Sequence, residues 1–536
     1  MRVGDIYETR IDAMGASGEG VCRPEGFALF VRGAVEGDLA RVRVTKLNKS
    51  YGFAALLEIV EPSKSRVEPQ CSSFGVCGGC AMLNIGYEKQ LEIKERIVRD
   101  ALERVGGFSE PDVFPIVPSV PNTHYRNKAQ YPITPRGAGF FMRASHNVVS
   151  AQNCALQDIV SAAVLNVTEE YMKKFGVMPY DEKSGDGIVR HVCTRSGKSD
   201  TIVVIVTNTS VLPYEHEFVK ALTERLGTRL CGVVQNINKE RTNVVFGKRD
   251  KLLFGRRFIM DNIGKINYKI SYKSFYQVNP HTTLPLYEKV LELAAPRGET
   301  VFDLYCGCGT ISLFLARAAR EVIGVEIVPS AVKDAAENAY INNITNVRFY
   351  EGAAEEIVPQ IISDKPCGVV VLDPPRRGCD KSLLDCVVNA TPKRIVYVSC
   401  NSATLARDVR VLCDGGYTLK EVHPFDQFPH TMHVETVVLL SKGEIDSKKV
   451  RVEFSLENMD MSGFQKDATY GQIKERVLEQ TGLKVSSLYI AQIKQKHGII
   501  ERENYNKSKS DNTKQPKCPP EKEKAITEAL RYFGMV

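Results

Sequence analysis

The chain has 536 residues, enough for about three to four domains. Charged residues make up 25% and apolar residues 43%, so the composition excludes a wholly disordered or fibrous protein. The formal net charge of +7 permits a polyanionic partner. No apolar run reaches the roughly eighteen residues of a membrane span, and residues 1–9 lack the apolar stretch of a signal peptide. The sequence therefore predicts a cytoplasmic protein without a membrane partner, in which the 15 cysteines are thiols, metal ligands or a nucleophile.

Residues 1–60 alternate short apolar runs with glycine-containing turns, which predicts a small β-barrel of the OB type. Basic and aromatic side chains fall together in its second half: Arg41, Arg43, Lys46, Lys49, Tyr51 and Phe53. Such a combination is typical of a surface that binds single-stranded nucleic acid. A solvated hairpin without this role is the alternative.

Residues 61–271 are predicted to form a central α+β domain. It begins with a loop rich in Cys and Gly, followed by a helix over 87–105 whose apolar stripe we expect to pack on the catalytic domain. Gly106 and Gly107 end this helix. The stretch 110–270 is rich in β-type runs, and we expect one helix in it, near 155–175.

Residues 272–444 alternate β-type and helical patterns. Strands are predicted over 300–304, 322–325, 369–372, 395–399 and 436–440. The first four runs are continuously apolar, as strands covered on both faces are. This pattern predicts a doubly wound α/β sheet.

Residues 445–536 form an appendage with a helix-turn-helix outline. Thr469 is a candidate N-cap for a first helix, and Ser486 or Ser487 opens a second that contains Lys494 and Lys496. We expect both lysines on one exposed face, either for binding nucleic acid or simply as a solvated face. Residues 505–524 are expected to form a linker before a terminal helix.

The turn after the strand 300–304 has the character of a nucleotide-binding site. Gly307 and Gly309 let the backbone approach a ligand closely, and Glu326, nineteen residues after Gly307, can accept hydrogen bonds from ribose hydroxyls. The glycines do not form the G-x-G-x-x-G pattern that cradles a pyrophosphate. S-adenosylmethionine is therefore favoured over NAD. Cys306 and Cys308 are expected to be small turn residues, and a tight turn without a ligand is the alternative.

Two later strand ends supply reacting groups at the same edge of the sheet. Asp373 follows the strand 369–372, and Cys400 follows the strand 395–399. A thiolate that adds to C6 of a pyrimidine makes C5 nucleophilic, and a general base must afterwards remove the C5 proton. Candidates for that base lie in 423–435, where Glu435 starts the last strand. The histidines of this segment match no common zinc motif, and inert burial is the alternative for Cys400.

Five motifs together carry a family resemblance: Phe275-Tyr276-Gln277-Val278-Asn279, the turn 303–310, Asp373-Pro374-Pro375-Arg376, Ser399-Cys400-Asn401 and His433-Val434-Glu435. Over residues 1–441 the sequence resembles the RNA uracil-C5-methyltransferase family, with a mild departure at Tyr276, where Phe is usual. The resemblance implies a class I S-adenosylmethionine-dependent methyltransferase fold, an N-terminal TRAM barrel and RNA binding.

The same resemblance implies roles for individual residues. Four would contact S-adenosylmethionine: Gln277, Tyr305, Glu326 and Asp373. Cys400 would be the nucleophile, and Glu435 would accept the C5 proton.

A cysteine cluster lies outside the catalytic domain. Cys71, Cys77 and Cys80 come from one loop, and Cys154 can supply a fourth thiolate. By spacing alone, four thiolates suit either tetrahedral zinc or an iron–sulfur cluster. The motif resembles the [4Fe-4S] site of the family branch that modifies 23S ribosomal RNA, which implies an iron–sulfur central domain with a structural or RNA-orienting cluster.

We therefore expect a monomeric enzyme that methylates C5 of a uridine in 23S ribosomal RNA. The alternatives are methylation of a transfer-RNA uridine and an RNA-binding assembly factor that has lost catalysis. Cytosine-C5 methylation is disfavoured because Asp373-Pro374-Pro375 carries no adjacent thiol. A radical S-adenosylmethionine enzyme is disfavoured because its cysteines normally follow the spacing C-x3-C-x2-C.

Overall fold

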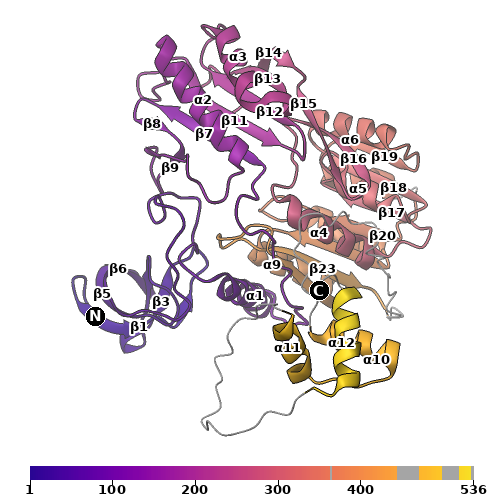
Figure 1. Cartoon of the computed structure of the whole chain (residues 1–536). Coiled ribbons are helices and arrows are strands. Elements are labelled where there is room, and N and C mark those ends of the chain that lie inside the picture. Colours follow the sequence, from indigo (N-terminus) through magenta and orange to yellow (C-terminus); the bar gives the residue numbers. More distant parts are fainter. Residues whose placement is uncertain (363–364, 444–469, 498–517, 533–536) are drawn as a thin grey trace. The chain divides into compact units, whose positions relative to one another are not determined.

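A computed structural model describes residues 1–362, 365–443, 470–497 and 518–532 (Figure 1). The chain divides into two compact units, Met1–Asp446 and Ser447–Val536, each with its own buried core. Among the described residues, none of the helices combines the length and apolarity needed to span a bilayer.

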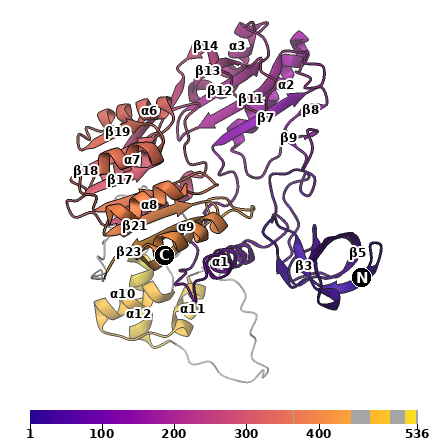
Figure 2. The same ribbon diagram turned by 180° about the vertical axis from the view of Figure 1, so that it is seen from behind.

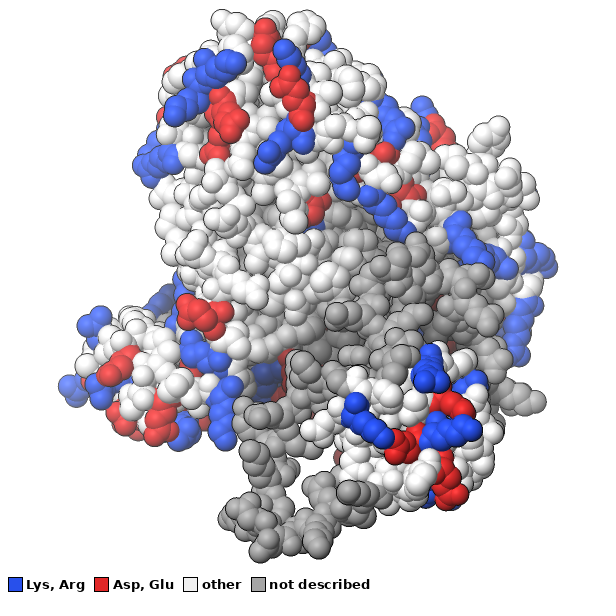
Figure 3. All heavy atoms as spheres, viewed as in Figure 1, with Lys and Arg blue, Asp and Glu red and all other residues white. Residues whose placement is uncertain are grey.

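The N-terminal residues form a small barrel-like sheet with the strand order β1-β5-β6-β4-β3-β2. The strands are β1 Ile6–Arg10, β2 Ala13–Met14, β3 Gly20–Cys22, β4 Ala28–Val31, β5 Leu39–Leu47 and β6 Tyr51–Glu61, with a 3-10 turn at Pro24–Gly26. Alternate residues of β5 point inward, so Ala40, Val42 and Val44 are buried, whereas Arg41 and Arg43 are exposed. On the face shown in Figure 3, acidic and basic side chains of the barrel are interspersed.

The aromatic residues expected on the barrel surface do come together. The Tyr51 and Phe53 rings are exposed and lie edge to face with centroids 5.7 Å apart, and Phe30 contacts both. Arg41, in contrast, is engaged in ion pairs with Glu8 and Glu58.

The central region contains a second six-stranded sheet, with the order β14-β13-β12-β11-β7-β8, and a separate hairpin of β9 with β10. Its strands are β7 Lys128–Thr134, β8 Gly137–Ala138, β9 Phe140–Phe141, β10 Val148–Val149, β11 Val189–Ser196, β12 Thr201–Thr207, β13 Leu230–Ile237 and β14 Arg249–Gly255. The helices α2, Ile159–Phe175, and α3, Glu215–Leu226, share a buried apolar cluster with one face of this sheet. A 3-10 turn at Gly227–Arg229 follows α3.

The prediction of a single helix in this region was wrong, because α3 is a second one. Only two of its side chains, Phe218 and Leu222, are buried, so its apolar stripe is too narrow to stand out among charged neighbours. The helix near 155–175 is present as α2, whose N-terminus is capped by the Asp158 carboxylate.

The catalytic region is a seven-stranded sheet with the order β19-β18-β17-β20-β21-β23-β22. Its strands are β17 Thr300–Leu304, β18 Glu321–Glu326, β19 Val347–Glu351, β20 Val369–Leu372, β21 Arg394–Ser399, β22 Thr418–Phe425 and β23 Glu435–Ser441. Its helices are α4 Pro280–Ala294, α5 Thr310–Leu315, α6 Pro329–Ile341, α7 Ala354–Ile362, α8 Lys381–Ala390 and α9 Ser402–Asp414. Figures 1 and 2, taken from opposite sides, show α4, α5 and α6 on one face and α7, α8 and α9 on the other.

This sheet confirms the predicted doubly wound fold. The strand order reverses between β17 and β20, and the loops that follow the two strands diverge there to leave a crevice for a ligand. The two strands that the sequence did not reveal are β19, an edge strand with partly exposed residues, and β22, whose first half is also partly exposed. Strands of that kind lack the continuous apolar run that marks a buried strand.

Two further elements pack on the catalytic sheet. Helix α1, Tyr87–Arg104, contributes Val98 and Leu102 to the buried cluster beside β20 and β21, and it contacts α9. The hairpin of β15, Phe258–Ile263, and β16, Ile266–Ser271, buries its apolar face in the cluster that contains α4 and α5.

The C-terminal unit is a three-helix arrangement of α10 Tyr470–Thr481, α11 Ser487–Lys496 and α12 Pro520–Tyr532. Ile473, Ile490 and Ile526 are fully buried at its centre. The Ser486 hydroxyl caps α11 as predicted, whereas Thr469 lies outside the described residues.

Two expectations for this unit need correction. Lys494 is only 6% exposed, so it does not share an exposed face with Lys496, which forms an ion pair with Glu523. The predicted linker over 505–524 was placed too far along the chain, because α12 already begins at Pro520, and residues 505–517 lie outside the described part. Helix α12 packs on α11 in this unit.

Candidate active site

The turn between β17 and α5 is built for close approach of a ligand. Tyr305, Gly307 and Gly309 all adopt positive φ angles, and a side chain at Gly309 would press on the Phe349 ring at 3.0 Å. The Glu326 carboxylate accepts hydrogen bonds from the Gly307 N–H at 3.0 Å and from the Val328 N–H at 2.8 Å. The carboxylate at the end of β18 is therefore fixed against this turn.

Two buried aspartates lie beneath the turn. Burial raises the pKa of Asp303 to about 7, and burial together with the Asp303 charge raises the pKa of Asp373 to about 7. Asp303 accepts a hydrogen bond from the Ser312 hydroxyl at 2.5 Å, while its Oδ1 has no partner among the described residues. The charge of Glu326 also contributes to the raised pKa of Asp303. Asp303 therefore interacts electrostatically with two predicted cofactor residues, Glu326 and Asp373.

The other two predicted cofactor residues flank this group. Tyr305 is half-buried directly after β17, and its N–H donates to the Val325 carbonyl at 2.9 Å. Gln277 is buried just before α4, where its Oε1 accepts a hydrogen bond from Gln427 Nε2 at 3.1 Å. Gln277 is thereby tied to the loop that precedes β23.

Strand pairing brings Cys400 and Glu435 to one edge of the sheet. β21 and β23 run antiparallel and pair Ser399 with Thr436, so the next residues outward are Cys400 and Glu435. Burial and then the Glu435 charge raise the pKa of the Cys400 thiol to about 11, against the opposing effect of the Arg376 guanidinium. The thiol is therefore protonated at neutral pH.

Glu435 is a buried carboxyl beside a second one. Burial and the charge of Asp373 raise the pKa of Glu435 well above its usual range, and the Arg376 guanidinium lowers it. The two buried carboxyls interact electrostatically, so the charge of one opposes ionisation of the other. Burial also lowers the pKa of His433 to about 4, so the imidazole facing Arg376 at 3.3 Å is neutral.

The loop that leads into Glu435, residues 426–433, is anchored on helix α1 by a buried ion pair. Lys94 Nζ lies 2.5 Å from the Asp426 carboxylate, and both side chains are fully buried. The Tyr87 hydroxyl donates to the same carboxylate at 2.7 Å, and Lys94 also donates to the Phe428 carbonyl at 2.9 Å. These contacts satisfy the buried charges and fix the start of the loop.

A second set of contacts ties the same loop to the cysteine-rich segment. Gln90 Oε1 accepts from the His430 N–H at 3.1 Å, and its Nε2 lies 3.1 Å from His430 Nδ1. The His430 carbonyl in turn accepts from the N–H groups of Ala81 and Met82 at 3.0 and 3.1 Å. The residue after Cys80 is thus hydrogen-bonded to the loop that carries the predicted base.

Sequence reasoning missed Lys94 and Gln90. The available signal was their place on the buried side of α1, about two turns (Gln90) and one turn (Lys94) before Val98, where a lysine normally requires a buried partner.

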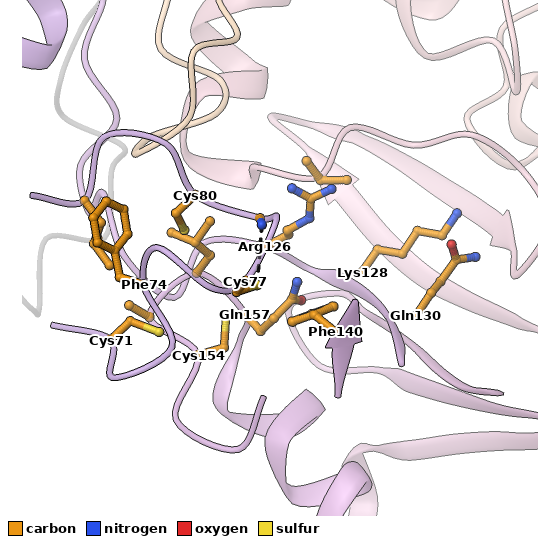
Figure 4. Close-up of a pocket in the computed structure, with 15 residues that line it drawn as sticks. Cys71, Phe74, Cys77, Cys80, Arg126, Lys128, Gln130, Phe140, Cys154 and Gln157 are labelled. Carbon is orange, nitrogen blue, oxygen red and sulfur yellow. Dashed lines mark hydrogen bonds between the residues drawn. The ribbon is translucent and has the colours of Figure 1, made fainter. Parts of the chain in front are cut away.

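The four predicted cysteine ligands line one cavity of about 410 Å³ (Figure 4). Cys71, Cys77 and Cys80 approach from one loop, and Cys154 approaches from the segment before α2. Burial, followed by the neighbouring thiols, raises the pKa of Cys80. Within the described ranges, no three His, Cys, Asp or Glu side chains converge closely enough to hold a single metal ion. The thiols thus surround a space rather than a point.

Comparison with known proteins agrees with this architecture. The profile of the tRNA (Uracil-5-)-methyltransferase family matches residues 86–443, and the TRAM domain profile matches residues 1–57. The chain belongs to the tRNA (uracil-5-)-methyltransferase family. The predicted family, the TRAM barrel and the methyltransferase fold are thereby confirmed.

The alignments cover nearly the full length of the related proteins. An uncharacterized RNA methyltransferase of Halalkalibacterium halodurans is 43% identical over 444 residues, which cover 81% of this chain and 97% of the relative. One from Clostridium tetani is 42% identical over 449 residues, covering 82% of this chain and 97% of the relative. The crystal structure of Pyrococcus abyssi tRNA (uracil-54, C5)-methyltransferase in complex with S-adenosyl-L-homocysteine is 28% identical, with a TM-score of 0.65, and covers 81% of this chain and 100% of that one.

The protein is therefore an RNA (uracil-5-)-methyltransferase that uses S-adenosylmethionine. Its RNA substrate is consistent with the N-terminal TRAM domain.

Replacing Lys94 with Met should lower the free energy of unfolding of this methyltransferase by about 3–5 kcal/mol, because Asp426 would remain buried without its cation. At a temperature where the variant is folded, methyl transfer should fall more than cofactor binding does, since the loop leading to Glu435 loses its anchor. Chemical denaturation and single-turnover assays measure the two effects. The control is Lys89→Met, at a partly exposed lysine of α1 that pairs with Glu36 and Glu92 rather than with the loop. Equal effects of both substitutions would contradict the anchoring role.

Proposed function

We propose that the enzyme methylates C5 of a uridine in 23S ribosomal RNA. The observation that carries this choice is the cavity lined by Cys71, Cys77, Cys80 and Cys154, because their spacing resembles the cysteine motif of the family branch that modifies 23S RNA. Transfer RNA is the second candidate substrate, supported by the named activity of the Pyrococcus abyssi enzyme.

In this proposal Cys400 is the nucleophile. The thiol proton passes to solvent and the sulfur forms a bond to C6 of the uracil, while the electrons of the C5–C6 double bond pass to the C4 carbonyl oxygen as an enolate. The enolate carbon C5 then takes the methyl group that S-adenosylmethionine supplies. Arg376, which already opposes the rise in the Cys400 pKa, stabilises the thiolate at this step.

Glu435 completes the reaction as the general base. It removes the remaining hydrogen from C5, the C5–C6 double bond re-forms, and the Cys400 sulfur leaves as a thiolate. A carboxyl with a raised pKa is a stronger base than an ordinary one, provided that it is ionised when the adduct forms. Arg376 favours that ionised state.

The residues around the β17 turn fit S-adenosylmethionine. The Glu326 carboxylate retains acceptor capacity for ribose hydroxyls, because each oxygen accepts only one backbone hydrogen bond. A side chain added at Gly307 would meet no atom within 4 Å, so the space over the turn is open. We assign cofactor contacts to Gln277, Tyr305, Glu326 and Asp373.

We assign an iron–sulfur cluster rather than zinc to the cysteine cavity. The four cysteines are among the fifteen residues that line it, and their spacing resembles the [4Fe-4S] motif of the family branch that modifies 23S RNA. Thiolates are the usual ligands of [4Fe-4S] clusters. We assign the four cysteines to such a cluster, with a structural role: it would hold the loop whose residues Ala81 and Met82 support His430.

The substrate assignment predicts that 23S RNA lacks one modification when Cys400 is replaced. Cells that produce only the Cys400→Ala protein should lack a 5-methyluridine in 23S RNA, whereas wild-type cells should contain it. Nucleoside mass spectrometry with position mapping of 23S RNA and transfer RNA measures this difference. Loss of the modification from transfer RNA alone would establish the second candidate instead.

The mechanism predicts that Glu435→Gln traps a methylated protein–RNA adduct through Cys400, since the C5 proton has no acceptor. Adduct resolution in the wild-type enzyme should accelerate as the pH rises well above 4.5, because the raised pKa of Glu435 delays its ionisation. Denaturing electrophoresis of labelled RNA measures both. A Glu435→Gln variant that binds RNA but forms no adduct would place the base elsewhere, and Cys400→Ala is the control without adduct.

The cluster assignment predicts that anaerobically purified enzyme is brown and contains about four irons and four sulfides per chain. Cys154→Ser should lose the iron, because three ligands from one loop leave the site open. Cys413→Ser, at a partly buried thiol of α9, is the matched control and should retain it. Colourless protein with one zinc per chain would refute the assignment.

A further inference from the structure

A row of polar side chains continues from the cysteine cavity along β7. Lys128 and Gln130 are alternate residues of this strand, and Arg126 precedes it in the same phase, so all three point to one face of the sheet. The intervening residues Ala129 and Tyr131 point to the other face, where they join the cluster with α2. Figure 4 shows Lys128 and Gln130 on the side of the cavity away from Cys71 and Cys154.

The cations of this face have no anionic partner. Within the described part of the chain, no carboxylate lies in ion-pair distance of Arg126, Lys128 or Arg195, which pairs with Lys128 across the β11–β7 ladder. Arg195 is fully buried, and although its Nη2 donates to the Ser274 carbonyl at 2.5 Å, its Nε and Nη1 have no partner there. Unpaired cations away from water are costly, so an anion that entered this face would be bound favourably.

The clustered thiols interact with Arg126 but not with Lys128. The Arg126 charge opposes the rise that burial and the other thiols cause in the pKa of Cys80. Burial, and then the charge of Arg195, lowers the pKa of Lys128 to about 8, and Cys193 and Arg126 also act on it. Cys193 itself is neutral at physiological pH, because burial raises its pKa to about 12. Lys128 is therefore available for a ligand that comes from outside the protein.

Arg126 connects this face to the active site. Burial, Arg376, Lys94 and finally Arg126 lower the pKa of His433, whose Nε2 faces Arg376 at 3.3 Å, and Arg376 acts on Cys400. An anion bound at Lys128 would thus lie along a series of neighbouring cations that ends at the reacting thiol. The polyanion that must reach Cys400 is the RNA strand.

We propose that Arg126, Lys128 and Gln130 bind a backbone phosphate of the RNA strand that carries the target uridine. The lysine and the guanidinium supply charge, and the Gln130 amide supplies a neutral donor for a phosphate oxygen. The contact carries no sequence information and sets the register of the strand relative to Cys400. This inference rests on the RNA methyltransferase function and holds for either candidate RNA.

The test compares Lys128→Gln with Lys220→Gln, which removes the same charge from an exposed position on α3, the helix on the opposite face of the same sheet. RNA affinity is measured against salt concentration with whichever RNA nucleoside mapping shows to be methylated. Lys128→Gln should bind about tenfold more weakly, and the slope of log affinity against log salt should fall by about 1. Lys220→Gln should match the wild type.

Cofactor affinity, iron content and the thermal midpoint of Lys128→Gln distinguish the possible outcomes. An unchanged salt slope in a folded variant would overturn the proposal, and a loss of iron with unchanged RNA affinity would assign Lys128 to the thiol site. Lys128→Arg provides a pH readout. Wild-type affinity should decline from pH 7 to pH 9 as the lysine loses its proton, whereas the arginine variant should keep its affinity.

Discussion

The antiparallel pairing of β23 with β21 is the constraint on which the active site depends. A parallel β23 would start at the far end of the sheet and carry Glu435 away from Cys400, whereas the observed register sets them at one edge. The same edge receives Asp373 from β20 and the ligand-binding turn from β17. The reversal of one strand thus brings Cys400, Glu435 and the turn after β17 to one edge, and burial raises the pKa values of Cys400 and Glu435 there.

The antiparallel direction of β23 requires the loop over 426–433, which connects the end of β22 to the start of β23. Three parts of the protein hold it: α1 through Lys94, the cysteine-rich segment through Ala81 and Met82, and the segment before α4 through Gln277. The loop that precedes Glu435 is therefore held at three separate points by segments far apart in the sequence.

Elements whose own residues show a clear hydrophobic pattern could be predicted from the sequence. The run 369–372 is apolar throughout and is fully buried as β20, and α2 has both an N-cap and a broad apolar stripe. Helix α3 was not predicted because only two of its side chains are buried, which leaves little hydrophobic periodicity in its sequence. Cys400 and Glu435 could be found from their places at strand ends, but the Lys94–Asp426 pair could not, because its partners are 332 residues apart. The raised pKa values likewise arise from burial in the assembled fold.

The closed core of the C-terminal unit has an evolutionary consequence. Ile473, Ile490 and Ile526 contact one another inside Ser447–Val536, while the family match ends at residue 443. The residues that form this core therefore lie outside the stretch that the family profile describes, so membership of the family places no requirement on the amino acids that pack the three helices.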